Sequence, residues 1–105
     1  MKAIILAGGL GLRLRSVVSD VPKPMADING IPFLEYLLKY LNRYPIDEVV
    51  LAVGYKYEVI KDYFKSDYKN IKLLYSIEDE PLGTGGAIKK AIELIDDDYI
   101  IILNG

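Results

Sequence analysis

The amino-acid sequence predicts a doubly wound α/β fold in which a mostly parallel sheet lies between two layers of helices. Three observations predict it: short apolar runs recur along the chain, segments with helical spacing separate them, and a glycine-rich turn follows the first run. Strands that are apolar on both faces are typical of a parallel sheet covered on both sides. Because such strands alternate with helices here, we expect a Rossmann-like, three-layer α/β/α arrangement.

Four segments are expected to form the strands, and three segments between them the helices. The strands are 3–7, 49–53, 71–75 and 99–103, and the helices are 32–44, 55–64 and 84–95. Thr84 is a possible N-cap of the last helix, and Asn29-Gly30 predicts a tight turn. The inward helix faces are predicted to be Phe33, Leu37, Leu38 and Leu41; Val59, Ile60, Tyr63 and Phe64; and Ala87, Ile88, Ala91, Ile92 and Ile95.

Composition narrows the function classes. A chain of 105 residues, about half of them hydrophobic, suits one domain. Its 13 basic and 15 acidic residues give a net charge of −2, so nothing favours a nucleic acid as partner. The first apolar run is too short for a signal peptide or a membrane span, so no membrane contact is expected. The sequence has no Cys and no His. This composition fits the cytoplasm, and chemistry must depend on Lys, Arg, Asp, Glu and backbone amides.

The first functional motif is Gly8-Gly9-Leu10-Gly11-Leu12-Arg13, directly after the first strand. Glycines let backbone N–H groups surround phosphate oxygens, and Arg13 adds a fixed positive charge. The motif is not a P-loop, since no Gly-Lys-Ser/Thr follows, and it lacks the third glycine of a dinucleotide fingerprint. A tight turn without a ligand is the alternative, but this composition favours phosphate binding.

The second motif is Lys23, held between Pro22 and Pro24. Two prolines fix the backbone on either side of one ammonium group, which suits a lysine that must meet a phosphate. A solvated lysine in a rigid loop remains the alternative.

The third motif, 75–87, combines a strand end, an acidic turn and a glycine-rich helix start. A helix start of this kind can accept an anion or part of a nucleotide. Glu78 could accept hydrogen bonds from a base with two adjacent donors, as guanine presents through N1–H and its 2-amino group. The alternative is that Glu78, Asp79 and Glu80 form a solvated acidic turn.

Taken together, four motifs resemble the sugar-1-phosphate nucleotidyltransferase family over essentially the whole chain. Within that family they look like its guanylyltransferase branch. The motifs are Leu6-Ala7-Gly8-Gly9-Leu10-Gly11-Leu12-Arg13-Leu14, Pro22-Lys23-Pro24, Val53-Gly54-Tyr55 and Glu80-Pro81-Leu82-Gly83-Thr84-Gly85-Gly86.

The resemblance implies that a sugar 1-phosphate of the heptose or mannose type attacks the α-phosphorus of GTP, with Mg²⁺ bridging the phosphates. Catalysis is then positioning and charge neutralisation. Arg13 would grip the leaving pyrophosphate, and Lys23 would neutralise the attacked phosphate. Glu78 would contact the base, and Gly83 would pass close to it. The implied nucleotide-binding residues are Leu6, Ala7, Gly8, Gly9, Gly11, Leu12, Arg13, Glu78, Pro81, Gly83 and Thr84. The metal carboxylates and the sugar pocket are expected beyond Gly105.

Two departures from the family's pattern keep other functions open: position 12 is Leu, and the family's metal-binding Asp, which directly follows an Asn-Gly like that at 104–105, is not among these 105 residues. Leu12 stands where many members have a hydroxyl residue, which could cost about 1–3 kcal/mol of phosphate binding. We therefore expect residues 1–105 to be the N-terminal, nucleotide-binding part of a longer domain, inactive alone. The alternative is a non-catalytic nucleotide-binding or regulatory module. A dinucleotide-dependent oxidoreductase is disfavoured by the glycine spacing. The apolar last strand also predicts self-association along an exposed edge, or a homo-oligomer.

Overall fold

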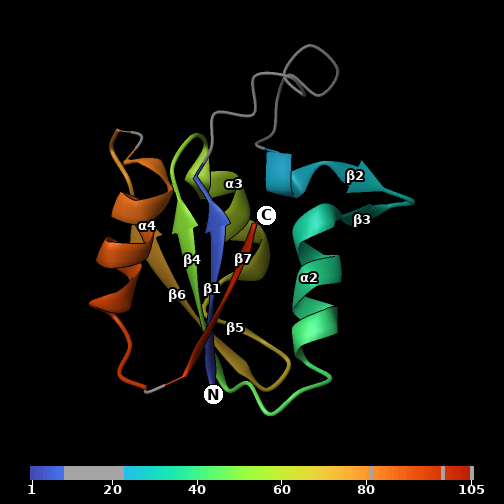
Figure 1. The fold of residues 1–105 in the computed structure, drawn as a ribbon. Helices are drawn as coiled ribbons and strands as arrows, with labels where there is room; N and C mark the ends of the chain where they lie inside the picture. Colours follow the sequence, from blue (N-terminus) through green and yellow to red (C-terminus); the bar gives the residue numbers. More distant parts are fainter. Residues whose placement is uncertain (9–22, 81, 98, 105) are drawn as a thin grey trace.

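The computed structural model describes residues 1–8, 23–80, 82–97 and 99–104, and its centre is a five-stranded sheet (Figure 1). Its strands follow the order β5-β6-β4-β1-β7. Four of them are mutually parallel, and the short β5 runs antiparallel to β6. The bounds are β1 Lys2–Ala7, β4 Glu48–Val53, β5 Asp67–Tyr68, β6 Ile71–Ile77 and β7 Ile100–Asn104.

The four predicted strands are confirmed, each with ends within two residues of the expected ones. The larger difference is at β6, which continues to Ile77 because it pairs with β4 up to Val53. The short β5 was not predicted, since two residues are too few to show an alternating pattern.

The order of the strands places a crevice at one end of the sheet. The chain adds β4 and β6 on one side of β1 and then crosses to add β7 on the other side. In open α/β sheets, ligands bind at the carboxyl ends of the strands near the point where the order reverses. The carboxyl ends of β1 and its neighbours are therefore the place to look for a site.

Helices cover both faces of the sheet, as predicted (Figure 1). Helices α2 (Phe33–Leu41) and α3 (Tyr57–Phe64) pack on one face, and α4 (Gly83–Ile92) packs on the other. Successive residues of β1 point to opposite faces. Ile5 therefore joins the core of α2 and α3, whereas Ile4 packs with Ala91 of α4.

Three details of the predicted helix faces are wrong. Leu34 of α2 is fully buried, and it was not predicted to face inward. Tyr63 and Ile92 were predicted to face inward, but they are 53% and 43% exposed. Tyr63 points outward because its hydroxyl donates to Glu35 of α2, at 2.9 Å.

The predicted N-cap of α4 is also wrong. The helix begins one residue earlier than Thr84, at Gly83, and the N-cap is Leu82 without a side-chain hydrogen bond. Gly83 has φ +73°, a left-handed conformation that glycine adopts readily. Thr84 therefore lies inside the first turn, and its hydroxyl does not cap the helix.

The predicted Asn-Gly turn joins two short strands, β2 (Asp27–Ile28) and β3 (Ile31–Pro32). Asn29 and Gly30 both have positive φ, 53° and 83°, as a tight two-residue hairpin turn requires. This hairpin follows the 3₁₀ turn η1 (Lys23–Met25) and leads into α2. None of the described helices combines the length and apolarity needed to cross a membrane.

Candidate functional site

The carboxyl ends of three adjacent strands meet at one level of the sheet. Ala7 of β1 pairs with Val53 of β4, and Val53 pairs with Ile77 of β6. The next residues along the three strands are Gly8, Gly54 and Glu78. The register therefore brings together the first glycine of the phosphate motif and the carboxylate predicted to contact a base.

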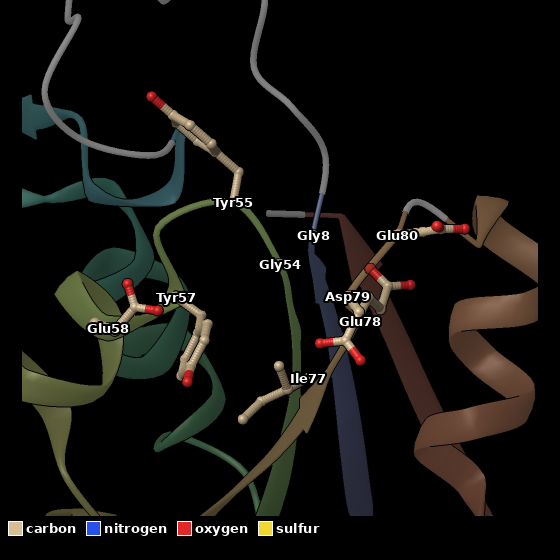
Figure 2. A pocket seen from close by; sticks show the side chains of 9 residues that line it. All are labelled: Gly8, Gly54, Tyr55, Tyr57, Glu58, Ile77, Glu78, Asp79 and Glu80. Atoms are coloured by element: carbon tan, nitrogen blue, oxygen red, sulfur yellow. The ribbon is translucent and has the colours of Figure 1, made fainter.

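A pocket of about 320 Å³ opens at these strand ends (Figure 2). Its walls come from the ends of β1, β4 and β6 and from the first turn of α3. The lining residues are Gly8, Gly54, Tyr55, Tyr57, Glu58, Ile77, Glu78, Asp79 and Glu80.

Two glycines allow the strand ends to approach each other. A Cβ on Gly8 would collide with the carboxylate of Glu78, so that carboxylate lies where a side chain at position 8 would be. A Cβ on Gly54 would lie 3.2 Å from the Gly8 carbonyl oxygen, closer than ordinary van der Waals contact. Glycine at position 8 therefore makes room for Glu78, a constraint separate from the predicted backbone access to phosphate.

Glu78 is the buried carboxylate of the pocket. It is 9% exposed, and its backbone N–H donates to the Val53 carbonyl at 2.8 Å, which continues the β6 pairing by one residue. Burial raises the pKa of Glu78 above its ordinary value, and the positive charge of Lys90 opposes that shift. A buried carboxylate with two acceptor oxygens suits a ligand that brings two hydrogen-bond donors.

The other carboxylates of the pocket lie at its rim. Asp79, Glu80 and Glu58 are exposed to solvent, and Figure 2 shows them around the opening. The alternative of a solvated acidic turn is therefore right for Asp79 and Glu80 but wrong for Glu78. Within the described ranges, no group of three His, Cys, Asp or Glu side chains could hold a metal ion.

The remaining predicted site residues are placed less directly. Leu6 and Ala7 end β1 with their side chains packed toward the cores, so only their backbone groups are available to a ligand. Gly83 and Thr84 are exposed at the start of α4. Lys23 is the first residue of η1, and only its backbone is described. Outside the described residues lie Gly9, Gly11, Leu12, Arg13 and Pro81.

Sequence reasoning missed part of the pocket wall. Tyr57 and Glu58 come from the first turn of α3, and Ile77 comes from the last position of β6. Gly54 and Tyr55 belonged to a quoted motif but had been given no role. The signal that could have found Gly54 is its position directly after a strand parallel to β1, the same position that Gly8 occupies.

A known family accounts for this arrangement of residues. A family model described as Nucleotidyl transferase matches residues 2–105. The chain belongs to the nucleotidyl transferase family. The match covers every described strand and helix, including the strand ends that form the pocket.

Two curated members of the nucleotidyl transferase family are 58% identical to this chain over 105 residues. Both are described as D-glycero-alpha-D-manno-heptose 1-phosphate guanylyltransferase, one from Campylobacter jejuni and one from Aneurinibacillus thermoaerophilus. The alignments cover 100% of this chain but 47% and 46% of those proteins. The chain therefore spans about half the length of the curated relatives it matches.

A solved structure has the same fold as this nucleotidyl transferase chain. The crystal structure of HddC from Yersinia pseudotuberculosis superposes with a TM-score of 0.86 at 47% identity, covering 98% of this chain and 46% of that chain. A second structure of the same protein, complexed with GMP-PN, superposes with a TM-score of 0.85. The Rossmann-like, mostly parallel fold predicted from the sequence is confirmed.

Proposed function

We propose that this chain forms the nucleotide-binding part of an enzyme that transfers GMP from GTP to a sugar 1-phosphate, giving a nucleoside-diphosphate sugar and pyrophosphate. A heptose 1-phosphate is the favoured acceptor, because both relatives at 58% identity are named for that substrate. A mannose 1-phosphate is the second choice. The enzyme would act in the cytoplasm, and its product would be used in surface glycan biosynthesis.

One observation carries the choice of guanine. Glu78 is buried at the strand ends beside Gly8, so its carboxylate adjoins the start of the phosphate motif. Guanine offers N1–H and an amino group side by side, whereas adenine has no hydrogen on N1. A carboxylate accepts from both guanine donors and repels the N1 lone pair of adenine. The HddC structure complexed with GMP-PN, whose name denotes a guanosine nucleotide, supports the same choice.

The proposed reaction needs no covalent intermediate. An oxygen of the sugar 1-phosphate attacks the α-phosphorus of GTP, the bond from that phosphorus to the bridging oxygen of the β-phosphate breaks, and pyrophosphate leaves. The protein's part is to position the reactants and neutralise their charge. We assign this neutralisation to Arg13 and Lys23, and the binding of nucleoside and phosphates to the backbone of Leu6–Gly9 and Gly11. Leu12, Pro81, Gly83 and Thr84 complete the proposed nucleotide contacts.

Two further partners belong to the proposal. The resemblance suggests Mg²⁺ as the metal, although the described residues do not offer a set of ligands for it. A second copy of the chain is the other partner, because β7 pairs with β1 alone among the described strands and Ile102 on it is 44% exposed. Light scattering that gives a monomer mass at high concentration would contradict that association.

Turnover by the complete gene product tests the function. GTP, ATP, CTP and UTP are each supplied with Mg²⁺ and either D-glycero-α-D-manno-heptose 1-phosphate or mannose 1-phosphate, and released pyrophosphate is measured. We expect release with GTP and the heptose phosphate. Saturable GTP binding without release from any pair would instead identify a non-catalytic binding module. If the protein neither binds a nucleotide nor releases pyrophosphate, both functions are contradicted.

The role of Glu78 is tested by Glu78→Gln. The amide keeps the size of the side chain but replaces one acceptor oxygen with a donor, which opposes a guanine donor. We expect the preference for GTP over ATP to fall by about tenfold to a hundredfold, the range of a good bidentate base contact. The matched control is Asp79→Asn, which changes an exposed carboxylate of the same pocket and should keep the preference. An equal loss in both variants would mean that general charge, not base contact, sets the preference.

A further inference from the structure

Lys90 connects α4 to the end of β6. Its ammonium group donates a hydrogen bond to the carbonyl oxygen of Ile77, the residue that precedes Glu78. The interaction is partly buried and joins α4 to the strand that directly precedes it in the chain. Lys90 does not line the pocket itself. Its contact is therefore with the backbone that carries the pocket carboxylate.

The direction of a helical side chain explains how Lys90 reaches this carbonyl. Lys90 lies in the last turn of α4, whereas the pocket lies near the first turn (Figures 1 and 2). Side chains on a helix lean toward its N-terminus, so the lysine stem runs back along α4 toward the strand ends. A long apolar stem with a charged end is suited to such a path, because the stem packs while the ammonium reaches a polar partner.

We propose that Lys90 is a positioning residue that holds Glu78 in place for base recognition. Its hydrogen bond fixes the peptide group between Ile77 and Glu78, and thereby the direction in which the Glu78 side chain leaves the strand. On the other side, Gly8 leaves just the space that the carboxylate fills. The hydrogen bond from Lys90 thus fixes the backbone next to Glu78, and the lack of a side chain at Gly8 leaves room for the Glu78 carboxylate.

Electrostatics supports this geometry. The positive charge of Lys90 acts on Glu78 and favours its ionised form, against the effect of burial. Ionised Glu78 accepts hydrogen bonds from two donors, whereas the protonated group would present a donor of its own to the base. Lys90 therefore helps to keep the carboxylate in the form that guanine requires.

The inference rests on the proposed binding of guanine, and the two can fail separately. Affinities of the complete gene product for GTP, ITP and ATP are measured for the wild type and for Lys90→Met, which keeps the apolar stem but removes the donor and the charge. ITP keeps the N1–H of guanine and lacks its amino group, so it reports on one of the two donors. ATP reports on the triphosphate contacts without either donor.

We expect Lys90→Met to lower the GTP-to-ATP affinity ratio by about tenfold, the scale of one hydrogen bond to a charged group. ATP affinity should stay within about twofold of the wild-type value, because ATP lacks the donors that Glu78 accepts. A loss confined to GTP and ITP would therefore point to the base contact. Lys90→Arg keeps the charge and donors and should restore most of the ratio. If Lys90→Met lowers the melting temperature strongly, Lys90→Ala, which also removes the donor and the charge, takes its place in the comparison.

The matched control is Lys89→Met on the same turn of α4. Lys89 is exposed, and both lysines carry charge near the helix C-terminus, where cations are generally stabilising. If Lys90 served only the helix, the two variants would behave alike. An unchanged GTP-to-ATP ratio in Lys90→Met, with a wild type that prefers GTP, would overturn the inference and leave the proposed function standing. A wild type without any preference for GTP would overturn both.

Discussion

The two faces of the central sheet are packed in different ways. On the face of α2 and α3, large aliphatic side chains from three strands and both helices form one extended core, including Ile5, Leu38 and Ile60. On the face of α4, the buried cluster is much smaller, and the helix contributes only alanines to the buried interior. The sheet is therefore held mainly from one side.

The thinner face carries the buried polar groups. Ser76 lies on the same face of β6 as Leu74, which packs against the small cluster, and its hydroxyl has no hydrogen-bond partner among the described residues. Glu78 follows two residues later and is also buried. Burying polar groups costs stability unless they are fully hydrogen-bonded. The large core on the opposite face supplies the stability that lets the α4 face keep such groups for a ligand.

The largest expected effect comes from truncating the larger core. Ile4 and Ile5 are consecutive residues of β1, both 0% exposed, and they point to opposite faces. Truncation of a buried isoleucine to alanine costs about 2–5 kcal/mol, and the cost depends on how far the site can relax. We expect Ile5→Ala to fall near the upper end and Ile4→Ala near the lower end. Chemical denaturation of both variants measures the two costs.

The pair Ile4→Ala and Ile5→Ala has its own control in Ile92→Ala. Ile92 is on α4 but 43% exposed, so its truncation leaves no cavity and should cost less than about 1 kcal/mol. If Ile4→Ala were as costly as Ile5→Ala, the two faces would be equally rigid and the comparison between them would be wrong.

The elements of the fold could be predicted because their signals are local. The four longer strands appear as apolar runs, and Asn29-Gly30 specifies its hairpin turn by residue type alone. The errors occur where a distant contact decides. Tyr63 faces outward because Glu35 of another helix accepts its hydroxyl, and no pattern within 55–64 could reveal that partner. The start of α4 was misplaced because Gly83 enters the helix with positive φ and needs no side-chain cap.

The next largest effect is expected at the pocket, and it appears in nucleotide binding rather than in stability. Gly8→Ala places a methyl group where the Glu78 carboxylate lies, and that carboxylate is the end of a flexible side chain that can move away. We expect the GTP-to-ATP preference to fall by about tenfold, since misplacing the carboxylate removes part of a bidentate contact. The free energy of unfolding should change by less than about 1 kcal/mol. Nucleotide titration and denaturation measure the two quantities.

The matched control for Gly8→Ala is Gly85→Ala in α4. A methyl group at position 85 meets no atom within 4 Å, and alanine is the better helix former by up to about 1 kcal/mol. Gly85→Ala should therefore stabilise the chain slightly and leave the nucleotide preference unchanged. If Gly8→Ala lowered the affinity for every nucleotide by the same factor, position 8 would act on the phosphates alone.

The site could be predicted only in part, because contacts between different elements decide part of it. The residue types of Gly8 and Glu78 indicated a phosphate and a base contact, but Glu78 could equally have belonged to a solvated turn with Asp79 and Glu80. What separates Glu78 from these neighbours is burial, and burial follows from the pairing of β6 with β4 and from the space above Gly8. That pairing joins segments far apart in the chain. Lys90 was missed for a similar reason, because its partner is a backbone carbonyl on another element.

The smallest expected effect is the dependence of stability on pH that Glu78 confers. Burial raises the pKa of this carboxyl in the folded chain above its ordinary value of 4.5. A carboxyl whose pKa is raised by folding binds its proton more tightly in the folded state. Its contribution to stability is therefore fully present below the unfolded pKa and is lost as the pH rises through the folded pKa. We expect Glu78→Gln, which stays neutral, to be more stable than the wild type at pH 7 and to lose this advantage below about pH 4.5.

Denaturation curves of the wild type and Glu78→Gln between pH 4 and pH 8 measure this difference directly. The Asp79→Asn variant keeps Glu78 buried and should keep the wild-type slope, because only an exposed carboxylate is changed. A constant difference between Glu78→Gln and the wild type at every pH would mean that the carboxyl is as well solvated in the folded chain as in the unfolded one. Glu78 would then belong with the exposed carboxylates of the rim, and the thin face of the sheet would hold no buried charge for a base.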